Sequence, residues 1–510
     1  MPFLSLPSST RLFYEIVSNE GQFDPHKPTL VALVPFCIAQ ASSIPQIGPS
    51  SPLRQTHNIF AFSPRSHGRT VSEVKPQHDA FVSAADLAFA FEALQLPPSH
   101  VFAPGAICGR IGLAFTTLFP DLVLTLALAG VSGSDPMTSI EGFRTLEATM
   151  FNPSDVEDLY EIMAELALQL WDDCTSADKL DDFINLLLRR HNPRHASKSY
   201  ELCRLSYMGM HLPAEAVAEI KTPVLLFHGE RDGYSNPAHS QRWQSLLTGS
   251  SEVELHLIPD APHLVWSTQS DFVLSHLTSF LSRHALPPSP TSSAPSPASP
   301  DFALALRTCA RMTSNPKVLL RNPRSPESFS ALTKEEKDDA AKDLERVKGF
   351  EKHWRAQPLP EGAEGSEPWD EGMEGRVPRP KWRWSRRHDE RPTSDRGASA
   401  RFSVASEVVV QIASVQETTK LSASSPGVSP GSVSPSRVSM VESNILPPAQ
   451  EADEEQEKED EDGSRSRKDS GFIESFLEDD ELDAAKQLDG VLESMSRVAL
   501  AKAQGTPILA

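Results

Sequence analysis

Residues 100–120, HVFAPGAICGRIGLAFTTLFP, constrain the fold of this chain more than any other segment. They begin with a short apolar run typical of a buried strand and continue through a turn of mostly small residues over 104–109. The apolar pattern over 110–118 then indicates a helix. Small residues let a helix begin close to the preceding strand, and glycine tolerates the strained backbone of a sharp turn. We therefore predict a strand, a tight turn and a helix in direct succession.

This succession resembles the nucleophile elbow of the α/β-hydrolases, whose motif is G-x-S-x-G. In similar hydrolases the helix ends about fourteen residues after the nucleophile, at a proline before the next strand. Counting back from Pro120 places Ala106 at the serine position, and Pro104 and Cys108 replace the flanking glycines. Placing Cys108 at the nucleophile position would put Arg110 where a small residue is needed. Because a methyl group has no lone pair and no ionisable proton, Ala106 cannot attack a carbonyl.

Two later loops match the same family and imply the rest of a catalytic triad. The apolar segment 222–229 runs into Asp232, which lies where similar hydrolases carry the triad acid. Segment 253–258 is followed by a loop with His263, where they carry the triad histidine. The chain order of nucleophile, acid and histidine is that of the α/β-hydrolases. The resemblance therefore implies that Asp232 and His263 form a pair.

The resemblance also implies an oxyanion hole built from backbone N–H groups. Segment 29–34 reads as a buried strand and ends at Pro35, where similar hydrolases have a His-Gly pair. Proline has no N–H to donate. The N–H groups of Ile107 and Cys37 are the candidate donors.

A further segment, residues 64–70 with the sequence PRSHGRT, resembles the D-x-R-G-x-G-x-S turn of the same family. Arg65 and Gly68 occupy matching places in it. Loops of this kind satisfy their polar groups locally. We therefore expect Arg65, His67 and Arg69 to be hydrogen-bonded within their own loop.

The order of the apolar patterns predicts the architecture of the first part of the chain. Up to residue 130 strands and helices alternate, as in a mostly parallel sheet with helices on both faces. The alternation stops over about 131–219, where helical patterns follow one another and this fold family places its lid. We predict an α/β-hydrolase fold over residues 8–285, with a mostly parallel central sheet, flanking helices and a helical lid.

The composition changes after residue 285. Residues 286–331 begin with a Pro/Ser-rich run and are predicted to be a linker. Residues 332–354 read as a charged helix, polar nearly all round, that lies in solvent or meets a partner. Residues 355–470 are predicted to be disordered. Residues 471–502 have apolar residues at near-helical spacing, which predicts an amphipathic helix that forms on a protein partner or docks back on the body.

Charge and cysteine content bear on partners and compartment. A net charge of -21 over 510 residues argues against nucleic acid as the main partner. Five scattered cysteines without a CxxC pair indicate reduced thiols in an intracellular, cytoplasmic protein. They form no zinc motif, and we expect no metal or cofactor. The longest apolar run, 122–131, is too short to span a bilayer, and the N-terminus lacks the pattern of a signal peptide.

Three hypotheses remain open for the activity. In the preferred one, the chain is an inactive or non-classical hydrolase homologue that binds a small molecule or a partner, and Asp232 and His263 persist as a packed pair. In the second, His263 acts as a general base on water or on a substrate, as in a hydrolase or lyase. In the third, Cys108 is the nucleophile, with its thiol made more acidic by a helix N-terminus. The family resemblance implies a hydrolase by descent, whereas Ala106 argues against ordinary serine hydrolysis.

Overall fold

The structure of the chain is a computed structural model that describes most of its first 356 residues. The described ranges are 3–17, 23–24, 26–36, 41–136, 143, 150–154, 156–172, 177–284 and 297–356. The predicted disordered segment 355–470, apart from its first two residues, and the predicted amphipathic helix 471–502 lie outside them. So does Cys37, the candidate oxyanion donor.

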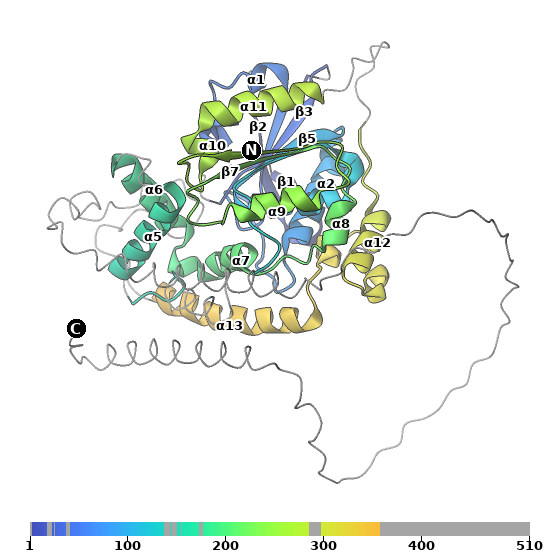
Figure 1. Cartoon of the computed structure of the whole chain (residues 1–510). Helices are drawn as coiled ribbons and strands as arrows, with labels where there is room; N and C mark the ends of the chain where they lie inside the picture. The colour runs from blue at the N-terminus through green and yellow to red at the C-terminus, as the bar shows by residue number, and fades with distance from the viewer. Residues whose placement is uncertain are drawn as a thin grey trace, which may run out of the picture. The chain divides into compact units, whose positions relative to one another are not determined.

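A mostly parallel sheet forms the centre of the described chain (Figure 1). Its strands lie in the order β1-β2-β4-β3-β5-β6-β7-β8, with β1, β2 and β4 antiparallel and the remaining neighbours parallel. Helices cover both faces, so β3, β4, β5 and β7 are buried at every residue. This strand order is that of the α/β-hydrolase fold and confirms the predicted fold class. The strands are β1 (Phe3–Ser5), β2 (Arg11–Ile16), β3 (Thr29–Leu33), β4 (Asn58–Ser63), β5 (Ser99–Pro104), β6 (Val123–Ala129), β7 (Val224–Gly229) and β8 (Val253–Ile258).

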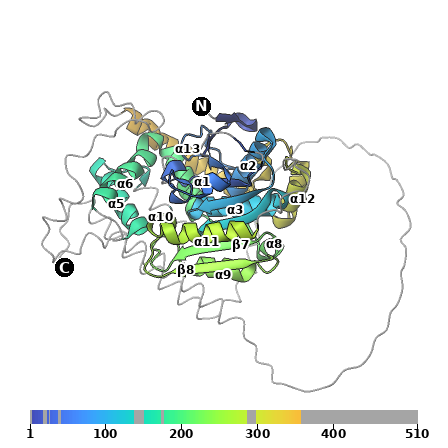
Figure 2. The same cartoon turned by 90° about the horizontal axis from the view of Figure 1, so that it is seen from above.

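Helices lie on both faces of this sheet. Helices α1 and α11 lie on one face, where α11 runs beside β7, and α2 and α9 lie on the other (Figures 1 and 2). Helix α3 packs against α2 and against β5 and β6. The helices that flank the sheet on its two faces are α1 (Leu53–Thr56), α2 (Ala80–Leu94), α3 (Ala106–Leu118), α9 (Ala238–Leu246), α10 (Val265–Thr268) and α11 (Ser270–Arg283). Short 3₁₀ turns are η1 (Pro7–Ser9), η2 (Ala41–Ser43), η3 (Pro45–Ile47) and η4 (Pro120–Leu122).

A helical insertion separates β6 from β7, where the lid was predicted. Its elements are α5 (Val156–Trp171), α6 (Ala177–Arg190), η5 (Pro193–His195), α7 (Ala196–Tyr207) and α8 (Ala214–Ala218). Helices α5 and α6 pack on each other, whereas α7 packs against α3. Leu159, Met163 and Leu170 of α5 are buried, because its apolar residues recur at helical spacing and face one side.

The described C-terminal extension, residues 297–356, differs from the linker predicted for 286–331. Residues 297–331 contain α12 (Phe302–Met312), η6 (Pro316–Leu320) and η7 (Pro326–Phe329). The Phe302 ring stacks on Phe89 of α2 with centroids 4.3 Å apart, and Phe329 is fully buried. The linker prediction is therefore wrong for 297–331, because the nearby Pro/Ser run obscured apolar residues that complete the core.

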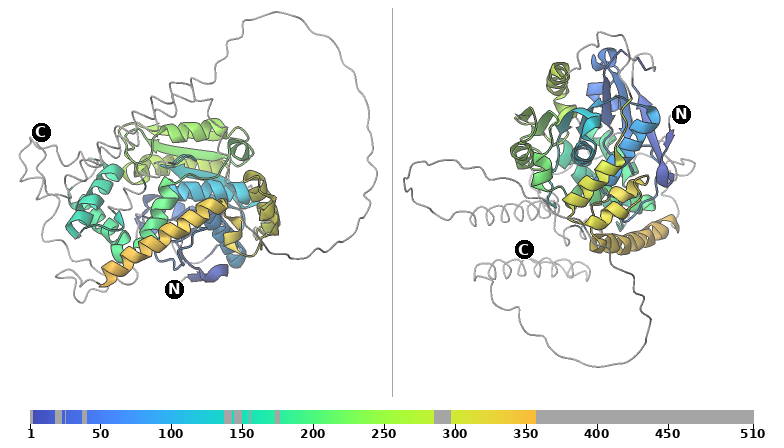
Figure 3. Two further views of the ribbon diagram at one scale, coloured as in Figure 1. Left: turned by 90° about the horizontal axis from the view of Figure 1, so that it is seen from below. Right: turned by 90° about the vertical axis from the view of Figure 1, so that its right-hand side faces the viewer.

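The charged helix over 332–354 also packs on the body. It is α13 (Lys334–Ala356), which lies along α7, and Figure 3 shows it as the orange helix. Ala340, Leu344 and Val347 are buried at helical spacing, so this helix has one apolar stripe. The expectation of a helix in solvent is wrong for this face.

The 64–70 turn also makes contacts outside its own loop. Within the loop, His67 Nδ1 lies 2.7 Å from the Arg65 carbonyl oxygen. The buried Arg65 guanidinium, however, donates to both carboxylate oxygens of Asp86 on α2, at 2.6 and 2.9 Å, and to Glu327 of η7 at 3.3 Å. Arg65 thus connects the sheet, α2 and the C-terminal extension, which corrects the expectation of a self-contained loop.

Across the described ranges, no helix is long and apolar enough to cross a membrane.

Candidate functional site

A strand, a tight turn and a helix follow one another directly, with β5 ending at Pro104 and α3 beginning at Ala106. The sharp turn falls on Gly105, whose φ of 88° lies in the region that only glycine adopts readily. Gly109 has a second role, because a Cβ there would lie 2.7 Å from Val131 Cγ2. Its small size lets α3 pack directly against the end of β6. Ala106 is the first residue of α3 and is buried.

The predicted acid and histidine come together at the ends of β7 and β8. Asp232 Oδ2 lies 2.8 Å from His263 Nδ1. Asp232 Oδ1 accepts the backbone N–H groups of Tyr234 and Ser235, at 2.9 and 2.7 Å. These contacts fix the carboxylate and hold the imidazole in one orientation, as the acid of a triad does.

His228 is a third member of this group that sequence reasoning missed. Its Nε2 lies 3.0 Å from Asp232 Oδ2 and 2.8 Å from the Ser235 carbonyl oxygen, and its Nδ1 lies 2.6 Å from Ser240 Oγ. The signal in the sequence is the His-Gly pair at the end of β7, four residues before Asp232. Asp232 therefore lies between two imidazoles.

The charge of Asp232 follows from this environment. Burial raises its pKa, whereas the neighbouring His263 and His228 and their hydrogen bonds lower it, and the net pKa lies well below the ordinary value. Asp232 is therefore ionised at neutral pH. Among the described residues, no group of three or more His, Cys, Asp or Glu side chains could hold a metal ion.

The space beside His263 is small. The cavity that the described residues form at the elbow has a volume of about 10 Å³, about the space of one water molecule. The His263 ring is flanked by Tyr234 and Trp266, with centroids 4.8 and 5.9 Å away. The lid takes part in the closure, because Leu170 of α5 lines the cavity and its carbonyl oxygen accepts the Leu264 N–H at 3.1 Å. The residues lining the cavity are Pro35, Phe36, Pro104, Gly105, Ala106, Ile107, Cys108, Leu170, His263 and Trp266.

The remaining predicted site residues lie at the same cavity where the structure describes them. Ile107 and Cys108 are in the first turn of α3, and both are buried. Cys108 is not in a disulfide. The pairing of Ile107 with Cys37 as oxyanion donors stays a prediction, because Cys37 lies outside the described residues.

No protein-family model and no curated protein matches this chain. Among solved structures, an enol-lactonase from Burkholderia xenovorans is similar, with 16% identity over 55% of this chain and 100% of that chain, and a TM-score of 0.44. An esterase from Exiguobacterium antarcticum has 14% identity over 55% and 98% of the two chains, and a TM-score of 0.44. A thermophilic esterase from Thermogutta terrifontis has 16% identity over 56% and 99%, with a TM-score of 0.44. By its own strand order and by the places of Asp232 and His263, this chain has the α/β-hydrolase fold.

Proposed function

We propose that this chain is an α/β-hydrolase-fold protein that acts by binding and not by serine hydrolysis. The observation that carries the proposal is Ala106, which shares a cavity of about 10 Å³ with His263. A methyl group cannot form an acyl-enzyme, and the cavity has no room for an ester beside the histidine. The Asp232–His263 pair then contributes stability, because it connects the loops after β7 and β8.

The second hypothesis, His263 as a general base, draws on the same pair. Part of the geometry of a triad is present, because Asp232 orients the His263 imidazole. Loss of the nucleophile leaves a residual catalysis of about 10³- to 10⁴-fold over water in a triad enzyme, which requires a bound substrate. Leu170 and Trp266 line the cavity beside His263, whose volume of about 10 Å³ is too small for such a substrate. The third hypothesis, Cys108 as nucleophile, meets the same obstacle.

The test is hydrolysis of a short-chain activated ester by the full chain. Wild type and His263→Ala are expected to give the same background rate. Ala106→Ser combined with Leu170→Ala is expected to exceed wild type by about tenfold or more, because it restores a hydroxyl and enlarges the cavity. Leu170→Ala alone is the control for the enlarged cavity.

Turnover by wild type that His263→Ala abolishes would contradict the proposal. In that case Cys108→Ala separates the two remaining hypotheses. Loss of activity in Cys108→Ala indicates a thiol nucleophile, and its persistence indicates that His263 activates water.

A further inference from the structure

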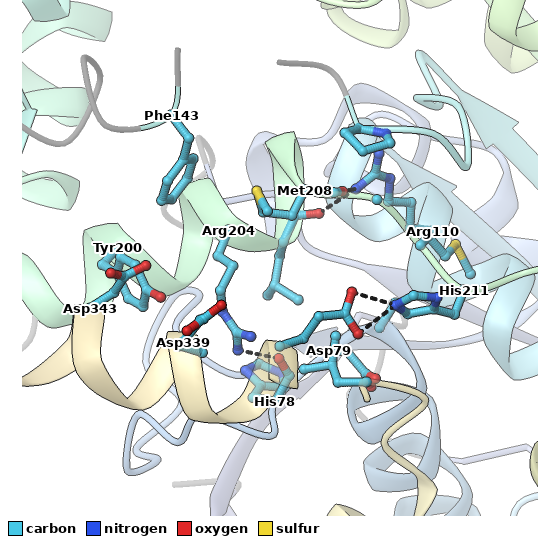
Figure 4. Close-up of a pocket in the computed structure, with 18 of the residues that line it drawn as sticks. His78, Asp79, Arg110, Phe143, Tyr200, Arg204, Met208, His211, Asp339 and Asp343 are labelled. Carbon is cyan, nitrogen blue, oxygen red and sulfur yellow. Dashed lines mark hydrogen bonds and ion pairs between the residues drawn. The ribbon is translucent and has the colours of Figure 1, made fainter. Parts of the chain in front are cut away.

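A much larger cavity lies away from the elbow, between α7 and α13. Its volume is about 690 Å³, within the range of small-molecule sites. Residues 134–136 after β6, residues 208–211 after α7 and residues 78–81 at the start of α2 also line it. It shares no lining residue with the cavity at His263. Figure 4 shows Asp339 and Asp343 of α13 on one side of this space and Phe143 and Met208 on the other.

Part of the lining of this cavity is apolar and aromatic. Phe143 and Tyr200 lie edge to face with centroids 6.0 Å apart, and Met208 and Met210 also line the cavity. Such rings attract cations through their negative faces, and methionine adapts to the shape of a bound group.

Three arginines and one lysine line the cavity, and two of the arginines, Arg110 and Arg204, are occupied by backbone carbonyls. Arg110 is fully buried, and burial lowers its pKa to about 10, so it stays charged at neutral pH. Its guanidinium and that of Arg204 donate to carbonyl oxygens at the ends of nearby segments. An anionic ligand would therefore have to displace structural hydrogen bonds to reach Arg110 or Arg204. The other two cations of the lining, Lys342 and Arg346, pair with Asp339 and Asp343 at the mouth. The acceptors of Arg110 are Gly133, Asp135, Leu205 and Met208, and those of Arg204 are Lys75, Pro76 and His78.

The carboxylates at the mouth are held much less firmly. Asp339 pairs with Lys342 at 2.8 Å, and these side chains are 61% and 73% exposed. Asp343 pairs with Arg346 at 2.9 Å, also three residues along the same helix. Exposed pairs of this kind are weak and exchange partners readily. A cation at the mouth can therefore take over Asp339 and Asp343 while its apolar body enters the cavity.

The floor of the cavity is rigid, which favours selective binding. His78 lines it, and its Nδ1 lies 2.6 Å from Glu201 Oε1 while its Nε2 lies 2.7 Å from Ser83 Oγ. Ser66 Oγ donates to the second oxygen of Glu201. All of these groups but Ser66 are nearly fully buried.

We propose that the cavity between α7 and α13 is a binding site for an organic cation with an apolar body. The cationic group lies between the carboxylates of Asp339 and Asp343 and the rings of Phe143 and Tyr200, and the apolar body fills the space beside Met208. The net charge of -21 adds a long-range attraction for cations. This inference rests on the proposed function, because it names the ligand class of a protein that acts by binding.

The test measures binding of three probes to the full chain by calorimetry: a phenylalkyl trimethylammonium, and the carboxylate and alcohol with the same apolar body. We expect the cation to bind about tenfold or more tightly than the carboxylate. Asp339→Asn with Asp343→Asn is expected to weaken the cation by about tenfold and to leave the alcohol unchanged. The matched control is Asp338→Asn with Glu345→Gln, which removes two exposed charges of α13 outside the cavity and should change the Kd by less than about twofold.

A second variant tests where the ligand binds. Met208→Trp narrows the cavity beside the proposed place of the apolar body and is expected to weaken binding of the cation, with folding checked by an unchanged unfolding midpoint. An unchanged Kd in this variant would overturn the site. Equal binding of cation and carboxylate, or an equal loss in the control variant, would overturn the ligand class while the binding proposal stands. Absence of cation binding to wild type would also overturn the inference, whereas the proposed function itself fails only if His263-dependent ester hydrolysis is found.

Discussion

Two buried histidine–carboxylate pairs in this molecule have similar nitrogen–oxygen distances, but only the His263–Asp232 pair is aligned as a hydrogen bond. His263 Nδ1 lies 2.8 Å from Asp232, and His78 Nδ1 lies 2.6 Å from Glu201. The first pair lies at a cavity of about 10 Å³, and in the proposed function Ala106 takes the place of its nucleophile. The second has Ser83 Oγ 2.7 Å from His78 and lies at a cavity of about 690 Å³.

The comparison shows that these distances alone do not identify a catalytic site. A nucleophile must also be reachable by the substrate. Ser83 lies in the first turns of α2, is 2% exposed and is not among the residues that line the large cavity. Neither pair therefore combines nucleophile, base and space. In the proposed function both pairs are structural: Asp232 joins the loops after β7 and β8, and Glu201 joins α7 to the segment before α2.

The largest expected effect comes from removing the C-terminal extension, which packs on α3 and forms one wall of the cavity beside His78. A chain ending at His284 loses Phe302 from Phe89, Glu327 from Arg65 and the α13 wall of the large cavity. Loss of buried aromatic side chains costs about 3–5 kcal/mol each, so we expect this chain not to unfold cooperatively. The measurement is urea unfolding followed by circular dichroism.

The control for this truncation is residues 1–356, which should match the full chain. A chain ending at His284 that unfolds with the midpoint of the full chain would show that the extension is dispensable. The cavity at His263 would then also be expected to stay closed, because its lining residues all precede residue 285.

The next largest effect is the loss of stability when the Asp232 or the Glu201 carboxylate is replaced, because the two contact different numbers of polar groups. Asp232→Asn removes a charge that meets two imidazoles and two backbone N–H groups, and we expect a loss of about 3 kcal/mol at neutral pH. Glu201→Gln affects His78 and Ser66 and should cost about 2 kcal/mol. Urea unfolding of both variants measures the difference.

The pH dependence checks the same assignment. For Glu201, burial raises the pKa, but its interactions with His78 and Ser66 lower it, and the net pKa is below its ordinary value, as it is for Asp232. A carboxyl group whose folded pKa is lowered stabilises the protein fully above its unfolded pKa of about 4 and loses that contribution as the pH falls further. The difference in unfolding free energy between wild type and each variant should thus shrink below about pH 4. A difference that stays constant down to about pH 3 would contradict the role of the charge.

Much of the fold and part of the site could be predicted from local patterns. Continuous apolar runs such as 222–229 identify buried parallel strands, and the loops that follow them carry Asp232 and His263. The closure of the cavity could not be predicted, because Leu170 and Trp266 reach it through tertiary packing of the lid. The Glu201–His78 pair joins distant segments without a motif, and the Pro/Ser run concealed the apolar stripe of α12.

The smallest expected effect is the loss of stability when one buried serine hydroxyl is removed beside His78 or beside His228. Ser83→Ala removes the hydroxyl beside His78, and Ser240→Ala removes the hydroxyl beside His228, where Nδ1 and Oγ are 2.6 Å apart. Both serines are buried, and each substitution should cost about 1 kcal/mol, the usual net value of one hydrogen bond. If Ser83 were instead a nucleophile activated by His78 and Glu201, a fluorophosphonate probe would label it and Ser240→Ala would leave that labelling intact. We expect mass spectrometry to find no labelled Ser83, because the hydroxyl lies behind the wall of the cavity and points to a histidine that serves as its structural partner.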